Sequence, residues 1–140
     1  MNPEIQIAKD KGYLKVQVRG RDSREASLEM FRRIVAACDE HNCLYALVEA
    51  HLINQTGVMV NYDMPQIIEE AGVTRKHRIA WVDLNQESYN MNYFAETVLH
   101  NRGYTMIRLF KTIEDGKVWL LDEIAVHERR VKAIEKTVSS

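Results

Sequence analysis

Apolar and polar residues alternate along several short stretches of the chain. Residues 5–8 and 13–18 alternate around a polar connection that ends in Gly12, a pattern that predicts a β-hairpin. Residues 44–48 and 79–82 are continuous apolar runs, which are typical of strands covered on both faces in a mixed or parallel sheet. The sequence therefore predicts a sheet that begins with an antiparallel hairpin and continues with buried strands.

Between these strands the apolar residues recur every three or four positions, as in amphipathic helices. Asp22 or Ser23 is positioned to cap the first helix, and Pro65 suits the first turn of a short helix closed by Gly72. The stripe expected to be buried in the first helix is Ser27, Met30, Phe31, Ile34, Val35 and Cys38. These signals place one helix before residues 44–48 and a shorter one after them.

A third helix follows residues 79–82 and ends near Gly103, before an extended run at residues 105–110. Its residues expected to face the core are Met91, Phe94, Ala95 and Val98. Strand, helix and strand with short connections form a crossover unit that joins parallel neighbours with right-handed geometry. We therefore expect a single α/β domain with a mixed, mostly parallel sheet of about five strands and helices on both faces.

The C-terminal part of the chain has helical spacing throughout. Thr112 is expected to cap a helix that buries Val118, Trp119, Leu120 and Leu121, despite the cost of Gly116. We expect residues 1–121 to form the domain and residues 122–140 a charged helical tail. The tail keeps a thin apolar stripe at Ile124, Val131, Ile134 and Val138. The stripe is too short to show which of three behaviours the tail has. The tail could dock on its own domain, dock on a second copy to form a homodimer, or fray.

The charge of the chain is balanced, and this limits its partners. Lys and Arg total 19 against 20 for Asp and Glu, so no overall field attracts nucleic acid or an anionic membrane. The first residues show neither a basic leader nor an apolar signal region, and no apolar run is long enough for a membrane span. We expect a cytoplasmic protein that does not bind nucleic acid.

Cysteine and histidine usage gives no indication of a metal or cofactor. Cys38 and Cys43 lack the spacing of a redox pair, and we expect two reduced, buried thiols. The 5 histidines are scattered without the paired spacing of a tetrahedral metal site. No metal ligand and no cofactor are therefore expected.

The order of elements, together with particular residues, resembles the STAS-like fold, and in particular its bacterial SpoIIAA-like branch, related to the sporulation anti-sigma-factor antagonist. The residues that carry this resemblance are 78–82, 94–96, 101–103, 107–110 and 118–120. They cover roughly the second half of the chain, and they are packing and capping residues. The resemblance implies a non-catalytic regulatory or protein-interaction module.

The resemblance also implies a phosphorylatable serine in an Asp-Ser-Ser/Thr-Gly turn after the third strand, where a phosphate changes how a partner kinase docks. The nearest match is Asn54-Gln55-Thr56-Gly57, in which Gln55 stands at the acceptor position and has no hydroxyl. Thr56 is the substitute phosphoacceptor, and the alternative is an ordinary turn in which Thr56 bonds its own backbone. The expected contact surface for a protein partner runs from Asn54 to Asp63 and includes Met59 and Tyr62.

Two further interpretations remain open. Glu49, His51 and Asp83 are expected just past the ends of two strands, where a carboxylate beside a histidine supports proton transfer, although solvated polar residues end most strands. A catalytic role is the least favoured. The second interpretation is a pocket for a small apolar ligand or lipid, which would make the protein a carrier or sensor. Its expected lining is Met59, Tyr62, Met64, Tyr89, Met91 and Tyr93, unless these residues simply close the core.

Overall fold

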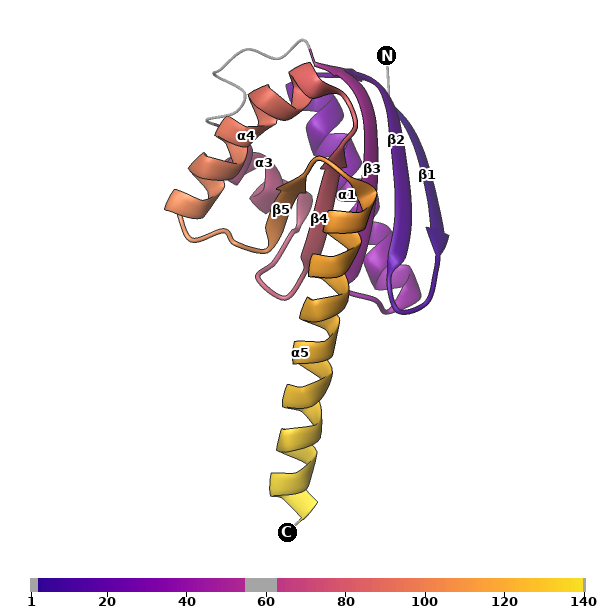
Figure 1. Ribbon diagram of the computed structural model, residues 1–140, viewed down its shortest axis with the longest axis vertical. Helices are drawn as coiled ribbons and strands as arrows, with labels where there is room; N and C mark the ends of the chain where they lie inside the picture. The colour runs from indigo at the N-terminus through magenta and orange to yellow at the C-terminus, as the bar shows by residue number, and fades with distance from the viewer. Residues whose placement is uncertain (1–2, 55–62, 140) are drawn as a thin grey trace.

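The computed structural model describes residues 3–54 and 63–139 of the chain. Within these ranges the strands are β1 (Glu4–Lys9), β2 (Leu14–Asp22), β3 (Tyr45–Asn54), β4 (Arg78–Asp83) and β5 (Ile107–Phe110). They form one sheet in the order β1-β2-β3-β4-β5, in which β1 runs antiparallel to β2 and all other neighbours are parallel (Figure 1). The predicted hairpin and the mixed, mostly parallel sheet are confirmed.

Helices cover both faces of this sheet. The labels follow Figure 1: α1 (Arg24–His41), α3 (Met64–Ala71) and α4 (Gln86–Asn101) connect successive parallel strands and cover one face, and α5 (Ile113–Ser139) crosses the other. Three connections on the same side are expected when each parallel neighbour is reached by a right-handed crossover. The predicted α/β class with helices on both faces is therefore confirmed.

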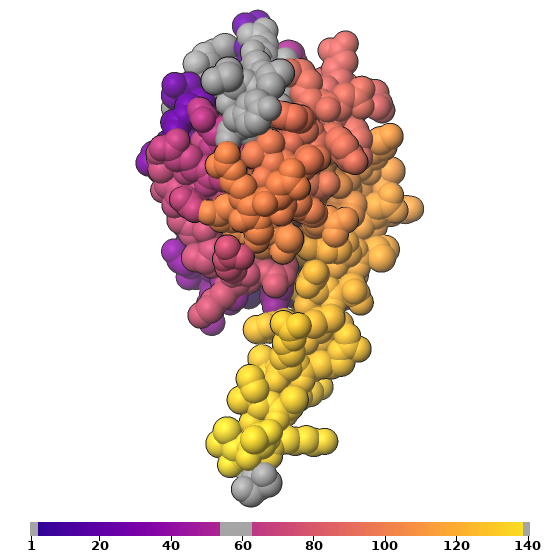
Figure 2. All heavy atoms as spheres, turned by 90° about the vertical axis from the view of Figure 1, so that its left-hand side faces the viewer, coloured from indigo at the N-terminus to yellow at the C-terminus, as the bar shows by residue number. Residues whose placement is uncertain are grey.

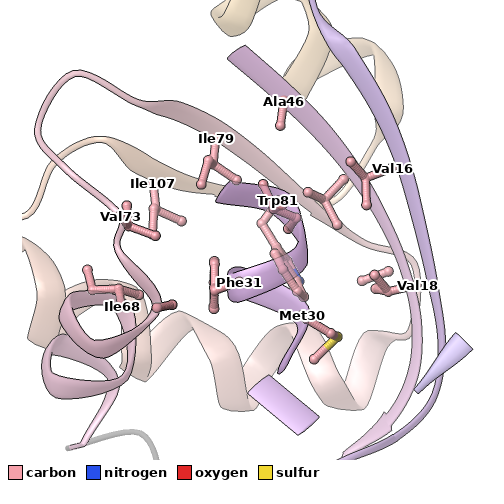
Figure 3. Close-up of a cluster of buried hydrophobic side chains, with 14 of the residues drawn as sticks. Val16, Val18, Met30, Phe31, Ala46, Ile68, Val73, Ile79, Trp81 and Ile107 are labelled. Carbon is pink, nitrogen blue, oxygen red and sulfur yellow. The ribbon is translucent and has the colours of Figure 1, made fainter. Parts of the chain in front are cut away.

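The larger part of the core lies between the sheet and α1, α3 and α4. Leu14, Val16 and Val18 of β2 point into it, and Ile34 of α1 is fully buried against them. Phe31 of α1 packs against Trp81 of β4 with ring centroids 5.5 Å apart (Figure 3). In β4 and β5, Trp81 and Leu109 are register partners, as are Ile79 and Ile107, so these strands are side by side and parallel as predicted.

The smaller part of the core lies under α5, and glycine makes the close approach of this helix feasible. A Cβ added to Gly116 would lie 2.8 Å from Cγ2 of Val82 and 3.2 Å from Cδ1 of Leu47. One turn later, Leu120 is fully buried against the same strands. Glycine destabilises a helix interior, but at this position its lack of a side chain allows α5 to pack closely on the sheet.

The prediction that all four residues from Val118 to Leu121 are buried was wrong. Val118 is 69% exposed and Leu121 is 43% exposed. Consecutive helical residues are separated by about 100°, so the same sheet cannot bury four of them in succession. Only Leu120 lies on the inner face at this level, with Trp119 half-buried beside Phe110.

The predicted inner face of α4 was also partly wrong. Ala95 and Val98 are buried as expected, whereas Phe94 is 36% exposed. The buried face instead includes Ser88 and Leu99. A polar residue is tolerated there because the Ser88 hydroxyl donates to the carbonyl oxygen of Leu52 at 3.0 Å. The buried face of α4 is therefore rotated about the helix axis, relative to the face that its apolar residues alone predict.

The C-terminal residues form one helix without a break. α5 begins on the sheet and runs well beyond it, so its last turns project from the body (Figures 1 and 2). The Oγ1 atom of Thr112 accepts a hydrogen bond from the Asp115 N–H at 3.1 Å, in agreement with the expected cap. A boundary between a domain of residues 1–121 and a tail of residues 122–140 stays a prediction. In the part of the chain that the structure describes, no helix is long and apolar enough to cross a membrane.

Candidate functional site

The candidate site is the edge of the sheet at which the parallel strands end, the usual ligand edge of α/β proteins. The structure corrects one boundary there. β3 continues to Asn54, so Glu49 and His51 lie within the strand and not beyond its end. Asp83 is the last residue of β4.

The three polar residues proposed as a rim cluster are not brought together. Successive side chains of a strand point to opposite faces, and Ala46, Val48 and Ala50 point into the larger core. Glu49 and His51 therefore point to the face crossed by α5. Asp83 shares the face of Ile79 and Trp81, which is covered by α4. The sheet itself separates the histidine from the buried carboxylate.

Glu49 lies on the open part of the sheet, beside β2. The Nε2 atom of Gln17 donates a hydrogen bond to its Oε2 atom at 3.1 Å. His51 is the register partner of Arg19, which is exposed on the same face. This pair of neighbouring strands therefore presents a polar, half-buried surface to solvent.

Asp83 is a buried polar group at the carboxyl edge, and both of its carboxylate oxygens accept hydrogen bonds. Its side chain is buried, and its Oδ2 atom accepts a hydrogen bond from Nδ2 of Asn92 at 2.7 Å. Its other oxygen faces the Asn85 N–H at 3.4 Å. Asn85 caps α4 by accepting from the backbone N–H of Glu87 at 3.0 Å, and its Nδ2 atom donates to the carbonyl oxygen of Leu52 at 3.3 Å. The end of β4 and the start of α4 are thereby fastened to β3.

Asp22 forms a second buried carboxylate at the same edge, at the end of β2. Its Oδ1 atom accepts a hydrogen bond from the Ser27 hydroxyl at 2.8 Å. The adjacent Ser23 is the residue that caps α1, since its Oγ atom accepts from the Ala26 N–H at 3.0 Å. The sequence predicted either Asp22 or Ser23 as the cap. Ser23 is the cap, whereas Asp22 accepts its hydrogen bond from Ser27, which lies one turn into the helix.

Burial changes the acidity of both carboxyl groups. Removal from water raises the pKa of Asp83 to about 6, against the opposing hydrogen bonds from Asn92 and Asn85, and the nearby charge of Asp22 raises it further. Burial likewise raises the pKa of Asp22, opposed by the Ser27 hydroxyl and the Ser23 N–H. The helix-covered side of this edge therefore holds two carboxyl groups for which ionisation is costly.

A small cavity of about 50 Å³ lies next to Asp22 and to Asn92, the hydrogen-bond partner of Asp83. Its polar lining comes from Asp22, Ser27, Asn92 and Glu96, and its apolar lining is Phe31, Met64, Trp81, Ala95, Leu99, Ile107 and Leu109. Of the residues proposed from the sequence to line an apolar pocket, Met64 is present, whereas Tyr93 is 57% exposed on α4. The volume suits a few water molecules or a small apolar group.

Apolar side chains are exposed at the carboxyl edge. Ile53, near the end of β3, is 57% exposed, and Leu84, directly after β4, is 42% exposed. The backbone N–H of Leu84 donates to the carbonyl oxygen of Ala50 at 3.2 Å, so the two strand ends that carry these side chains are adjacent. Exposed apolar side chains at the usual ligand edge are a feature of interaction surfaces.

Most of the contact surface expected from the sequence lies outside the described residues. Gln55, Thr56, Gly57, Met59 and Tyr62 all fall there, so the structure leaves that expectation untested. The two neighbours that frame them are described. Asn54 ends β3 as the register partner of Asp22, and Asp63 precedes α3.

Two other expectations concern residues that the structure describes. Cys38 and Cys43 are free and buried, as predicted. Met91 is half-buried on α4. Among the residues of known position, no three His, Cys, Asp or Glu side chains gather in a way that would hold a metal ion.

The sheet order, the single-sided crossovers and the polar carboxyl edge define an α/β protein with a SpoIIAA-like fold. A solved structure from Shewanella loihica PV-4, described as an uncharacterised protein of the DUF3478 family with a SpoIIAA-like fold, is similar to this chain with a TM-score of 0.50. The alignment covers 85% of this chain and 94% of that protein at 16% sequence identity. No family model matches the sequence, and no curated protein matches it. The likeness confirms the fold expected from the sequence.

Proposed function

We propose that this protein is a non-catalytic regulatory module of the STAS-like type, which binds a protein partner through the carboxyl edge of its sheet. The observation that supports this function most is the exposure of Ile53 and Leu84 on adjacent strand ends at this edge. The proposal also rests on the SpoIIAA-like fold of the chain. The partner surface would extend from these two residues across Asn54 to Asp63.

The arrangement of the polar residues favours binding over catalysis. A general acid and base must both reach one substrate, and Asp83 lies on the opposite face of the sheet from Glu49 and His51. The carboxylates of Asp22 and Asp83 are occupied by hydrogen bonds from Ser27 and Asn92. These bonds fix strand ends to helix starts, which is a positioning role for a binding edge.

A capture experiment with the full chain tests this function. A tagged chain is incubated with extract from its source cells, and bound proteins are quantified by mass spectrometry. We expect one protein near equal molar amount that is lost from the Ile53→Asp, Leu84→Asp double variant. Val118→Asp is the matched control, because Val118 is also exposed and apolar but lies on α5. Failure to recover any stoichiometric partner, or equal loss with Val118→Asp, would refute the proposal.

Thr56 is the proposed site of regulation of this contact, on the basis of the resemblance described above. Phosphorylation would add close to two negative charges three residues after Ile53 in the sequence, and we expect this charge to weaken an apolar contact. Phosphopeptide mapping of the tagged chain from source cells tests the modification, with Thr56→Ala as the control. If Thr56 is never phosphorylated while partner binding persists, regulation at this residue is wrong and the binding function is unaffected.

The second candidate function is binding of a small apolar ligand, and the cavity beside Trp81 and Leu99 favours it. Its volume of about 50 Å³ is far below the roughly 300–1,000 Å³ of typical ligand pockets, so a lipid would require its walls to move apart. Native mass spectrometry of the purified chain tests for a co-purifying molecule. An Ala95→Leu variant that fills the cavity should lose the added mass, and a single species with the mass of the chain alone would exclude this function.

A further inference from the structure

The last turns of α5 carry an apolar stripe with nothing against it in the described part of the chain. Val131 is 39% exposed, Ile134 is 64% exposed and Val138 is 80% exposed. The last turns of α5, to which they belong, run beyond the sheet (Figure 1). A helix of this length is marginal in water on its own strength, because most helical stability comes from packing of an amphipathic face. A partner that covers the exposed stripe would therefore stabilise these turns.

This stripe continues the contact between α5 and its own sheet. At about 100° per residue, the positions from Gly116 through Leu120 and Ile124 to Val138 fall within an arc of about 80°. The sheet covers the first three of these positions, down to half-buried Ile124. The later positions, His127, Val131, Ile134 and Val138, follow at intervals of four, three and four, which is the spacing of a coiled-coil seam. An occupant of the stripe must therefore lie directly beyond the amino edge of the sheet.

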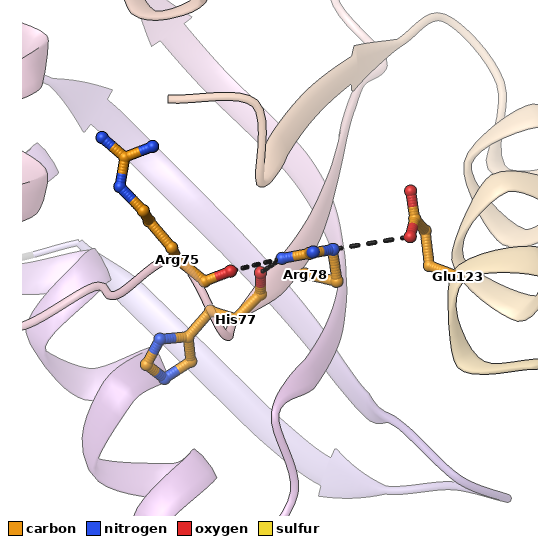
Figure 4. A network of polar contacts seen from close by, with 4 residues as sticks. All are labelled: Arg75, His77, Arg78 and Glu123. Carbon is orange, nitrogen blue, oxygen red and sulfur yellow. Dashed lines mark hydrogen bonds and ion pairs between the residues drawn. The ribbon is translucent and has the colours of Figure 1, made fainter. Parts of the chain in front are cut away.

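A basic groove of about 400 Å³ lies at that edge, between α5 and the starts of β3 and β4. Its lining includes Tyr45, Lys76, Arg78, Glu123, His127 and Arg130. Arg78 is held in place by an ion pair with Glu123 at 3.5 Å and by donating to the carbonyl oxygens of Arg75 and His77 (Figure 4). Within the described ranges, Lys76 and Arg130 form no ion pair. The groove thus has an excess of positive charge in a chain of formal net charge -1.

We propose that the occupant is α5 of a second copy of this chain, packed antiparallel along the stripe. If His127 of one copy faces Val138 of the other, Val131 faces Ile134 in the next layer, so the apolar positions meet in a single register. This register places the last turn of the second α5 beside His127 and Arg130, at the groove. A helix carries partial negative charge at its C-terminal end, which complements the unpaired cations there.

Parallel packing is excluded by the bodies of the two copies. In a parallel pair, the face of α5 that meets its own sheet at Leu120 would also have to face the second body. In the antiparallel pair, each body lies beyond the free end of the other helix. Two like charges, Glu128 and Glu135, come close at the margin of this pair, and Lys136 near the helix end points away from the stripe. We therefore expect a modest affinity, because these exposed glutamates repel each other at the margin of the pair.

Light scattering of the full chain over a range of concentrations tests the pairing. The mass should rise from that of one chain towards that of two, and Ile134→Glu should restore the mass of one chain. Arg129→Glu is the control, since this residue lies on the opposite side of α5 and the change adds more negative charge. Circular dichroism verifies that both variants keep their helix. A single-chain mass at every concentration, dimers that persist with Ile134→Glu, or their loss with Arg129→Glu would refute the proposal.

Cysteine cross-linking tests the direction of packing. Copies with His127→Cys are mixed with copies with Val138→Cys and oxidised, and the native Cys38 and Cys43 are buried. The antiparallel register predicts a disulfide between the two kinds of copy. It predicts none between two His127→Cys copies, whose positions would be roughly 16 Å apart along the helices. A disulfide within the His127→Cys copies and none in the mixture would overturn the antiparallel arrangement.

The role of the groove has its own measurement. Lys76→Glu should raise the dissociation constant of the pair roughly twofold to fivefold, the usual range for an exposed charge contact. Arg21→Glu makes the same charge reversal at the carboxyl edge and should leave the constant unchanged. An equal effect of both variants would remove the groove from the interface.

Discussion

The buried carboxyl group of Asp83 should make the protein less stable at neutral pH than at mildly acidic pH. Burial disfavours the charged form and raises the pKa of this group from its ordinary value of 3.8 to about 6 in the folded protein. A folded-state pKa above the unfolded one means that the folded protein binds the proton more tightly. This contribution therefore favours folding below about pH 4, decreases as the pH rises from about 4 to 6, and is a constant cost above that range.

The size of this cost follows from the two pKa values. The difference of about two pH units corresponds to about 3 kcal/mol at 1.36 kcal/mol per unit. The change Asp83→Asn removes the charge and keeps an oxygen that accepts from Asn92. We expect the variant to be more stable than the parent by about 1–3 kcal/mol near pH 7.5, and nearly equal to it near pH 4.

Urea unfolding followed by circular dichroism at both pH values measures this difference. Asp122→Asn serves as the control, because it makes the same chemical change at an exposed position on α5. Comparing each variant with the parent at the same pH removes the contribution of all other titrating groups. If Asp83→Asn destabilises the protein equally at both pH values, the argument from burial is wrong and the carboxylate has a net stabilising role.

Three further changes test the packing and capping described above, each by urea unfolding. Gly116→Ala should destabilise the protein by about 1–2 kcal/mol, because the clash outweighs the gain in helix propensity, and this loss should disappear in a Val82→Ala background. Ser23→Ala should cost about 1 kcal/mol through loss of the cap of α1. Leu120→Ala should cost about 2–5 kcal/mol, whereas Val118→Ala two residues earlier should change stability by less than about 0.5 kcal/mol.

Local patterns were sufficient to predict most of the elements and their order. The alternation around Gly12 predicted the hairpin, and the apolar run at residues 79–82 followed by helical spacing predicted the parallel pair of β4 and β5. Such signals work because strand and helix periods differ and because the buried face must be apolar. The SpoIIAA-like fold was expected from a resemblance that particular residues carry, such as residues 78–82 and 107–110, together with the order of the elements.

The site could be predicted only in part, since its contacts join residues distant in the sequence. Asp83 was singled out, but its partner Asn92 lies on the next helix and carries no distinguishing local pattern. The length of β3 was underestimated because Glu49 and His51 interrupt its apolar run, although the open face beside β2 accommodates both. The rotation of α4 was missed because the burial of Ser88 depends on the carbonyl oxygen of Leu52. In each case the deciding partner comes from another element.

α5 starts near the carboxyl edge of the sheet and projects past the amino edge, so the two proposed surfaces lie at opposite ends of the body (Figure 1). In the antiparallel pair, the two carboxyl edges would therefore point outwards in opposite directions. Such a dimer is bivalent and could bind two copies of a target at once. A target that is itself clustered would be bound with avidity greater than the strength of either contact.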